Sequence, residues 1–563
     1  MKKEISKILR KPLKKIGLKL EREEIEKYVE IPPSPDLGDF AFPCFAIANR
    51  LKENPHDIAI RIREKIKRVP YIFEEISVVG PYINFYLNRK IIFYELLKEI
   101  LKRREKFGKS NLGKRKTIVV EFSSPNIARR FGIGHIRSTI IGNAIANLCK
   151  FQGFTVKRIN YLGDWGTQFG KLILGYKKFG KPEKFKKDPI SHLQEIYVKV
   201  NKNKKYLEEA KKEFKKLEEG DRENLLLWRL FRDVSLKEFE KTYKLLGIEF
   251  DEIASESEAN KLVNKVIEEL KEKKIAKKSK GALVVHLKKY GLGTAIIKKS
   301  DDTTIYCTRD LAEAIRRYRK FKFEKMIYEV GQEQTLHFKQ LFKILEMMGY
   351  EWAKRCIHIS HGLYLGKDGK KFSTRKGKTA HLEEIIEECK KYAKAEIKKR
   401  FPNLKEEEVE RRGLKVALAA IFYGDLKNHR MRNIIFDIER FTSFDGNTGP
   451  YILYTYARAS SILKNTKAKT KLEKIESLDE NEIQILKLLE IFPERARKAF
   501  EELDPSIVAN YVYELCKKFN EFYHACRVLG SEKESLRLAI VEAFRQVTRN
   551  ACKILGIQLL DEM

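Results

Sequence analysis

The chain has 563 residues, 43% of them hydrophobic, and its 116 basic and 79 acidic side chains leave a net charge of +37. That length exceeds one ordinary hydrophobic core, so we expect several domains, and the positive balance favours nucleic acid as a partner over a lysine-rich surface that only solvates the fold. No apolar run is long enough to span a bilayer, and the eight scattered cysteines form no CxxC pair, which argues against a membrane protein, a disulfide framework and a zinc ribbon.

The hydrophobic pattern divides the chain into three predicted domains. Residues 1–112 begin with a helix, turn at 31–43 and end in a strand at 80–88, which predicts an α+β N-terminal domain. Residues 113–435 alternate strands with helices, which is typical of a parallel sheet in an α/β fold. Residues 436–563 are helical throughout, which predicts an all-α bundle.

The middle domain has predicted elements that can be placed along the chain. Strands are expected at 117–122, 155–162, 323–330 and 356–365, with helices from about Ser138 and at 334–347. Residues 175–251 are rich in Lys and Glu and helical in pattern, which indicates an insertion between two halves of the sheet. The N-terminal segment is basic but has no apolar core, so we expect no secretory signal and a cytoplasmic protein.

The first candidate site is the loop that contains Gly132, Gly134 and His135. It follows a predicted strand and enters a predicted helix, where unpaired N–H groups and the positive end of the helix dipole favour a phosphate. A second glycine-flanked loop at 369–377 contains Ser373, Thr374 and the cations Lys370, Lys371, Arg375 and Lys376. Either loop alone is weak evidence for a site, because a loop rich in cations can be a solvated turn. Together the two loops predict a nucleotide site.

The two loops stand in the order of the "HIGH" and "KMSKS" signatures, so the chain resembles a class I aminoacyl-tRNA synthetase. It is further identified as similar to the arginyl-tRNA synthetase family by six blocks: SSPNIARRFGIGHIRSTIIG, NYLGDWGTQFG, YCTRD, GQEQTLHF, SHGLYLGKDGKKFSTRKG and GPYILYTYARASSI. The resemblance implies a Rossmann-like catalytic domain with a helical insertion, an additional N-terminal domain that contacts tRNA and a helical anticodon-binding domain. It also implies ligation of L-arginine to tRNA(Arg) through an arginyl-adenylate, with ATP giving AMP and pyrophosphate, in translation.

The resemblance assigns roles to particular residues. Expected in catalysis are Gly132, Gly134, His135, Lys371, Ser373 and Arg375. Expected at ATP are Gly132, Gly134, His135, His361, Gly362 and Ser373. Expected at arginine are Ser124, Asn126, Glu256, Tyr306, Asp310 and Gln334. The chemistry agrees, because a guanidinium needs acidic, planar acceptors and phosphoryl chemistry needs positioning and cations. Asp310 as a helix cap and Glu256 as a surface acid are the structural alternatives.

Two positions depart from the family pattern. Gly132 stands where the first signature has its first histidine, and Thr374 stands where the second commonly has a lysine. Arg129 occupies the place of an upstream cation that many members carry, and Arg130 adds charge beside it. Another synthetase of the class, of the cysteine or glutamine type, is one alternative. A non-catalytic RNA-binding paralogue that kept the fold is the other, and Gly132 is its best support.

The partners expected from the sequence are tRNA(Arg), L-arginine and ATP with Mg²⁺, the metal held mainly by phosphates and water. No protein-bound metal is predicted, because His286, His337 and His361 have no ligand companions at metal spacing, and His337 is expected to be a packed helix residue. We expect a monomer. The C-terminal domain is expected to stack splayed bases on Tyr451, Tyr454 and Tyr456, although these rings could equally pack inside the fold.

Overall fold

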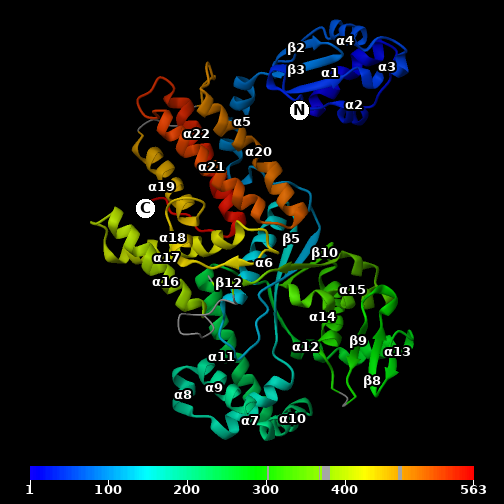
Figure 1. Cartoon of the computed structure of the whole chain (residues 1–563), viewed down its shortest axis with the longest axis vertical. Helices are drawn as coiled ribbons and strands as arrows, with labels where there is room; N and C mark the ends of the chain where they lie inside the picture. The colour runs from blue at the N-terminus through cyan, green and yellow to red at the C-terminus, as the bar shows by residue number, and fades with distance from the viewer. Residues whose placement is uncertain (301–302, 367, 370–380, 467–471) are drawn as a thin grey trace. The chain divides into compact units, whose positions relative to one another are not determined.

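The computed structural model describes residues 1–300, 303–366, 368–369, 381–466 and 472–563, and Figure 1 traces its elements. The contacts divide the chain into two compact units, which are described separately. The first unit contains Met1–Arg104 with Thr466–Glu490 and Phe522–Ala543, and the second contains Glu105–Asn465 with Ile491–Glu521 and Phe544–Met563.

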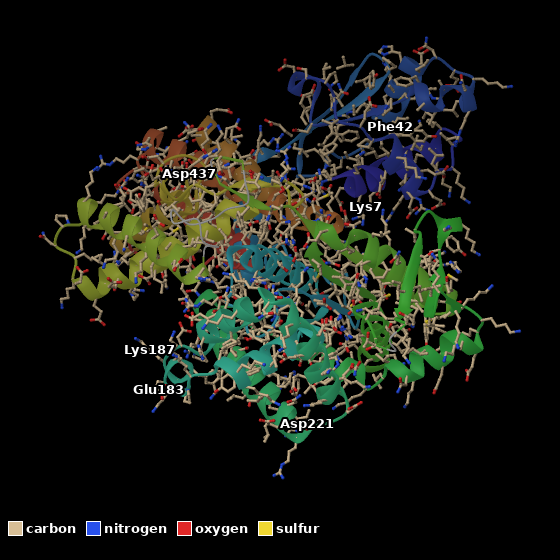
Figure 2. All side chains as sticks on the ribbon, turned by 60° about the horizontal axis from the view of Figure 1, so that its bottom comes forward. Lys7, Phe42, Glu183, Lys187, Asp221 and Asp437 are labelled. Carbon is tan, nitrogen blue, oxygen red and sulfur yellow. The ribbon has the colours of Figure 1, made fainter. Side chains whose placement is uncertain are left out.

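The first unit is built around a small antiparallel sheet in the order β1-β3-β2. Its N-terminal elements are α1 (Lys2–Lys15), α2 (Arg22–Tyr28), β1 (Phe40–Pro43), α3 (Phe45–Leu51), α4 (Pro55–Glu64), β2 (Phe73–Val79), β3 (Tyr82–Leu87) and α5 (Arg89–Arg103). Phe42 and Phe85 are fully buried in its core with Ile5 and Leu9 of α1, and Figure 2 labels Phe42 within this part of the chain. The α+β character predicted for the N-terminal region is confirmed.

The second unit is organised by a parallel sheet in the order β11-β10-β4-β5-β6. The strands and the helices that follow them are β4 (Thr117–Glu121), α6 (Ile133–Phe151), β5 (Thr155–Leu162), β6 (Glu252–Ser255), α12 (Glu256–Asn260), α13 (Val263–Glu272), α14 (Tyr306–Phe321), β10 (Lys325–Gly331), α15 (Thr335–Met347) and β11 (Cys356–His361). The chain leaves β4 on one side to reach β5 and returns to its other side as β10, so the order of strands reverses there. Ligands bind at such reversals in open parallel sheets.

The predicted insertion is helical, as its Lys and Glu pattern indicates. It comprises α7 (Thr167–Phe179), α8 (Pro182–Lys187), α9 (Pro189–Asn201), α10 (Lys204–Glu218) and α11 (Arg222–Leu246), and α7 to α10 gather together at the bottom of Figure 1. Glu183 and Lys187 project from its edge in Figure 2. A short antiparallel sheet, β7 (Lys277–Ser279), β8 (Ala282–His286) and β9 (Thr294–Lys298), precedes α14.

After residue 381 the described chain is helical except for one short strand. That strand is β13 (Ile434–Ile435), which pairs with the earlier strand β12 (Tyr364–Leu365). The helices are α16 (Leu382–Arg400), α17 (Glu406–Leu426), α18 (Ile438–Thr442), α19 (Gly449–Asn465), α20 (Glu480–Glu502), α21 (Ser506–Ala525) and α22 (Glu534–Leu555). The predicted fold class, a Rossmann-like α/β domain with an α+β N-terminal domain and a helical C-terminus, is confirmed. The bounds 1–112, 113–435 and 436–563 stay a prediction.

Candidate active site

The carboxyl ends of the parallel strands meet at one edge of the central sheet, and most of the predicted site residues leave from that edge. Asn126 follows β4, Glu256 begins α12 directly after β6, Gln334 follows β10 and His361 ends β11. Two hollows open there and share four lining residues, namely Ser124, Asn126, Val330 and Gln334. The sheet therefore brings together segments that are more than 200 residues apart in the sequence.

The larger cleft has a volume of about 790 Å³ and lies over the start of α6. Five predicted ATP residues line it: Gly132, Gly134, His135, His361 and Gly362. The helix begins at Ile133, earlier than the predicted Ser138, because Gly132 serves as its N-cap with an extended backbone. The Gly132 N–H donates to Nδ1 of His135 over 3.1 Å, which places the ring proton of a neutral His135 on Nε2.

The loop between β4 and α6 is held in a strained conformation. Ser123, Ser124 and Ala128 have φ angles of 69°, 42° and 58°, in the left-handed region that non-glycine residues rarely adopt. Buried hydroxyls stabilise it: Ser138 Oγ accepts the Ser123 N–H over 3.0 Å, and Ser235 Oγ of α11 accepts the Ala128 N–H over 2.8 Å. The loop that carries Ser124 and Asn126 is thus positioned by α6 and by the insertion.

The smaller hollow, of about 340 Å³, is an acidic pocket. All six residues predicted for arginine line it: Ser124, Asn126, Glu256, Tyr306, Asp310 and Gln334. Gly163 also lines it, and a Cβ there would lie 1.9 Å from Oδ1 of Asn126, so only glycine leaves room for that amide. Tyr306 and Asp310 occupy the first two turns of α14, as the four-residue spacing predicts.

Of the residues that the structure describes, four with carboxylates line the acidic pocket, and three of these are paired with arginine side chains. Arg317, fully buried, donates to Glu121 and, over 2.7 Å, to Glu313. Arg309 lies 3.4 Å from Glu256. A substrate cation would meet these three carboxylates already partly neutralised.

Asp310 is different, because its carboxylate is held by an imidazole. Oδ2 of Asp310 accepts a hydrogen bond from Nε2 of His337 over 2.7 Å. His337 is a buried residue of α15, as predicted, but its ring also lines the acidic pocket. Asp310 lies in the second turn of α14, whose N-cap is Ile305, so it is not a helix cap.

Burial raises the pKa of two carboxyl groups in the acidic pocket. Desolvation raises the pKa of Glu256 to about 7, although Arg309 opposes the shift. Desolvation also raises the pKa of Glu121, again against the effect of Arg317. Glu256 is not a surface acid, since only 18% of its side chain is exposed.

Part of the lining of the larger cleft belongs to a buried charge cluster that contains Arg137, Glu329 and His361. Nδ1 of His361 lies 2.7 Å from the Glu329 carboxylate. Burial lowers the pKa of His361, but Glu329 outweighs burial and the pKa lies above its usual value. Arg137 of α6, 1% exposed in its side chain, lies 3.5 Å from Asp425.

Comparisons with known proteins agree with this geometry. Residues 96–438 match the family model "tRNA synthetases class I (R), catalytic domain", residues 3–87 match "Arginyl tRNA synthetase N terminal domain" and residues 452–563 match "DALR anticodon binding domain". The chain belongs to the arginyl-tRNA synthetase family. The arginine–tRNA ligase of Clostridium perfringens is 43% identical over 97% of both chains, and arginine–tRNA ligase 2 of Bacillus anthracis is 43% identical over 97% of both.

Solved structures share the fold of this family member. An arginyl-tRNA synthetase from Plasmodium falciparum superimposes with a TM-score of 0.79 at 25% identity, covering 100% of this chain and 99% of that one. The arginyl-tRNA synthetase of Thermus thermophilus superimposes with a TM-score of 0.77 at 23% identity, covering 100% of both chains. Among the helices that the structure describes, none is both long and apolar enough to cross a membrane.

Some predicted residues of this synthetase lie outside the described part of the chain. They are Lys370, Lys371, Ser373, Thr374, Arg375 and Lys376. Of the two upstream cations, Arg129 lines the larger cleft with its guanidinium 5.7 Å from the Tyr197 ring, and Arg130 is ion-paired with Asp188. Arg130 is thus partly neutralised by the insertion.

Several residues of the acidic pocket were not predicted from the sequence to lie there: Glu121, Tyr161, Glu313, Arg317, Tyr328 and His337. A signal for two of them was present, because 306, 310, 313 and 317 follow the 4-3-4 spacing of one helix face. His337 lies three residues after Gln334 at a helix start, which is also a same-face spacing. Glu121, Tyr161 and Tyr328 are strand residues, and their facing could not be inferred without the sheet order.

The tyrosines predicted to stack on bases differ in their surroundings. Tyr456 is 1% exposed and its hydroxyl accepts a hydrogen bond from Arg549 over 2.6 Å, so its ring packs inside the fold. Tyr451 accepts a hydrogen bond from Asn520 over 2.8 Å, and Tyr454 lies 5.0 Å from the Arg458 guanidinium. The packing alternative therefore holds for Tyr456.

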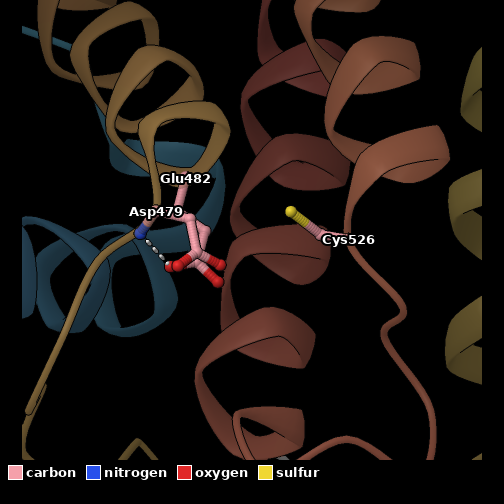
Figure 3. Close-up of side chains that lie close together, drawn as sticks. All are labelled: Asp479, Glu482 and Cys526. Atoms are coloured by element: carbon pink, nitrogen blue, oxygen red, sulfur yellow. Dashed lines mark hydrogen bonds between the residues drawn. The ribbon is translucent and has the colours of Figure 1, made fainter.

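One group of potential metal ligands occurs in the first unit. Asp479, Glu482 and Cys526 lie close together, and Figure 3 shows the carboxylates of the two acids side by side. Both carboxylates already face cations, since Lys533 and Arg537 each lie 2.8 Å from Asp479 and Arg537 lies 2.8 Å from Glu482. The group is an ion-pair network that ties α20 to α22.

Proposed function

We propose that this protein attaches L-arginine to tRNA(Arg) in two steps driven by ATP, and that the acidic pocket selects the amino acid. One observation carries the proposal. Among the pocket carboxylates of the described residues, Asp310 is the one that no described arginine neutralises. A single negative charge in a partly buried pocket requires a cationic side chain. The planar guanidinium presents its N–H donors to a carboxylate in a fixed fork, which the ammonium of lysine does not.

Arginine recognition uses both ends of the amino acid. The guanidinium binds Asp310, with Glu256 as the second acid and the Tyr306 ring covering it from the exposed side. Ser124 and Asn126, at the mouth shared with the larger cleft, bind the α-amino group. Gln334, which lines both hollows, contacts the end of arginine that carries the α-amino and α-carboxylate groups. This places the α-carboxylate of arginine toward the larger cleft.

The larger cleft holds ATP with its phosphates at the start of α6. The arginine carboxylate attacks the α-phosphorus, the bond to the bridging oxygen breaks and pyrophosphate leaves. His135 donates its Nε2–H to a phosphate oxygen, and the N–H groups of the first helical turn add fixed partial charge. In the second step a hydroxyl of the terminal tRNA ribose attacks the carbonyl carbon of arginyl-adenylate, and AMP leaves.

Pyrophosphate is stabilised by the cations of the second signature. Lys370, Lys371, Arg375 and Lys376 supply charge and Ser373 a hydrogen bond, a role based on their sequence pattern. Mg²⁺ enters with ATP and is held mainly by phosphates and water. Arg129, which lines the larger cleft, supplies the charge that Thr374 lacks.

The remaining assignments complete the proposal. Residues 1–112 and 436–563, which flank the catalytic domain in the sequence, contact tRNA, and the protein acts as a monomer in the cytoplasm. The reducing compartment is supported by the eight cysteines, all buried and none disulfide-bonded.

The test is arginylation of a tRNA(Arg) transcript by the wild type and two variants. His135→Ala removes a charge-assisted hydrogen bond of about 1.5–3 kcal/mol, so the rate should fall roughly 10- to 150-fold. Gly132→His should change it by no more than about a hundredfold in either direction, because Gly132 has an extended backbone (φ −95°) that any residue adopts. Wild-type protein that binds the transcript yet charges none would instead favour the non-catalytic paralogue.

A further inference from the structure

The Asp310 carboxylate is held by a side chain from a different helix. Nε2 of His337 lies 2.7 Å from Oδ2 of Asp310, and the two side chains are 8% and 19% exposed. Asp310 projects from α14 and His337 from the first turn of α15, so the contact joins two helices across the pocket wall. We propose that His337 is a positioning residue, which orients the Asp310 carboxylate toward the substrate guanidinium while leaving its Oδ1 available to that group. The inference rests on the function proposed above.

The other pocket carboxylates are paired with guanidinium groups and not with an imidazole. Glu121 and Glu313 share Arg317, and Glu256 faces Arg309, so each has a guanidinium against it. A guanidinium beside a carboxylate neutralises it and occupies its oxygens in a fork. The imidazole of His337 donates one N–H, from Nε2, to one oxygen, Oδ2. Asp310 therefore keeps its other oxygen, Oδ1, for the substrate.

The donor ring is itself fixed by packing. Its centroid lies 4.8 Å from that of Tyr306 at an interplanar angle of 60°, and 5.2 Å from that of Phe338 at 65°. Two edge-on neighbours restrict rotation of the imidazole, and the imidazole in turn restricts rotation of the carboxylate. A site held in this way loses less freedom when a planar guanidinium binds.

The test compares three substitutions of His337 by the KM for arginine, the KM for ATP and the kcat of tRNA arginylation. His337→Gln keeps a neutral N–H donor and should leave the KM for arginine within about threefold of wild type. His337→Leu keeps the bulk without the donor and should raise it roughly 10- to 100-fold, with the KM for ATP and kcat within about threefold. His337→Lys keeps a donor but adds charge, and should raise the KM for arginine at least as much.

A matched control is His358→Gln. His358 is a half-buried imidazole stacked 4.5 Å from the same Phe338 ring, but it donates to the backbone oxygen of Val330 and does not line the acidic pocket. This variant should leave the KM for arginine unchanged. Thermal unfolding of all variants checks that they fold. If His337→Leu does not fold, the KM values for arginine of the His337→Gln and His337→Lys variants are compared instead.

Two results would overturn the inference: an unchanged KM for arginine in His337→Leu, or equal values for the Gln and Lys variants. A parallel rise in the KM for ATP would also overturn it, since that indicates general damage. Asp310→Asn separates this inference from the proposed function. If Asp310→Asn raises the KM for arginine while His337→Leu does not, only the role of His337 fails. If Asp310→Asn has no effect, the assignment of the pocket fails as well.

Discussion

At the scale of single residues, the charge of Asp310 decides which amino acid can enter. A site built around a carboxylate leaves it unpaired when a substrate lacks the guanidinium, and such sites discriminate by roughly 10⁴–10⁵-fold. Asp310→Asn should therefore raise the KM for arginine more than about a hundredfold and leave the KM for ATP near that of wild type. Steady-state arginylation with each substrate varied in turn measures both. Arginine dependence like that of wild type would remove Asp310 from the pocket.

A second prediction at this scale concerns pH and Glu256. Its pKa is raised to about 7 by burial, and Arg309, Asp310 and Asp164 are the charged groups around it. A raised carboxylate pKa means that the ionised form is lost as pH falls through 7, and a guanidinium binds the ionised form more tightly. The apparent affinity for arginine should thus fall roughly tenfold from pH 8 to pH 6.

Calorimetric titration of arginine at several pH values measures this dependence. Glu256→Gln cannot ionise and should flatten the profile across the same range. A profile equally steep in wild type and variant would show that another group is responsible.

Most of the residues of the acidic pocket that were predicted could be recognised in the sequence, but their contacts could not. Five of the six residues predicted to bind arginine could be named because each lies in a recognisable block of sequence, whereas Glu256 lies outside those blocks. His337 lies in one of those blocks too, yet its contact with Asp310 depends on how α14 and α15 pack, which periodicity does not encode. The contact of Arg317 with Glu121 was also missed, because it depends on how α14 packs against β4.

At the scale of elements, helix α11 holds the loop between β4 and α6. Ser235, fully buried, supplies the acceptor for the Ala128 N–H. Ser235→Ala leaves that N–H unsatisfied, which should cost about 1–3 kcal/mol and lower the melting temperature. The KM values for arginine and ATP should both rise, because the loop lines both hollows.

Ser461→Ala is the matched control for this element. Within the described part of the chain, its hydroxyl donates only to the Ala457 carbonyl one turn back in α19, and the residue is exposed. Calorimetric unfolding and steady-state kinetics should leave this control like wild type. Normal KM values in Ser235→Ala would mean that α11 does not position the loop.

Element prediction from the sequence succeeded where alternation was strong. The strand expected at 155–162 is β5 (Thr155–Leu162), and the helix expected at 334–347 is α15 (Thr335–Met347). The start of α6 was placed five residues late, because the glycines that suggest a loop belong to its first turn, where Gly132 caps the helix. The strand expected at 356–365 divides into β11 and β12, which lie in different sheets.

At the scale of the whole molecule, the N-terminal region has a hydrophobic core of its own between Ile5 and Leu87. Removing residues 1–88 takes that core away and leaves α5 in place. We expect weaker tRNA binding and a salt dependence shallower by about 0.9 in log–log slope for each phosphate that the shortened protein no longer neutralises. The KM for arginine should stay near that of wild type.

Filter binding of a tRNA(Arg) transcript at several salt concentrations tests this, with circular dichroism as a check of folding. If affinity and salt slope both survive the deletion, the assignment of this region to tRNA binding fails.

The central claim is that the chain joins arginine, and no other amino acid, to tRNA. The most direct measurement incubates the wild-type protein with total tRNA, ATP, Mg²⁺ and each of the twenty radiolabelled amino acids in separate reactions. We expect that arginine alone becomes attached to tRNA, and that omission of ATP abolishes the signal. Attachment of a different amino acid, or of none, would contradict it.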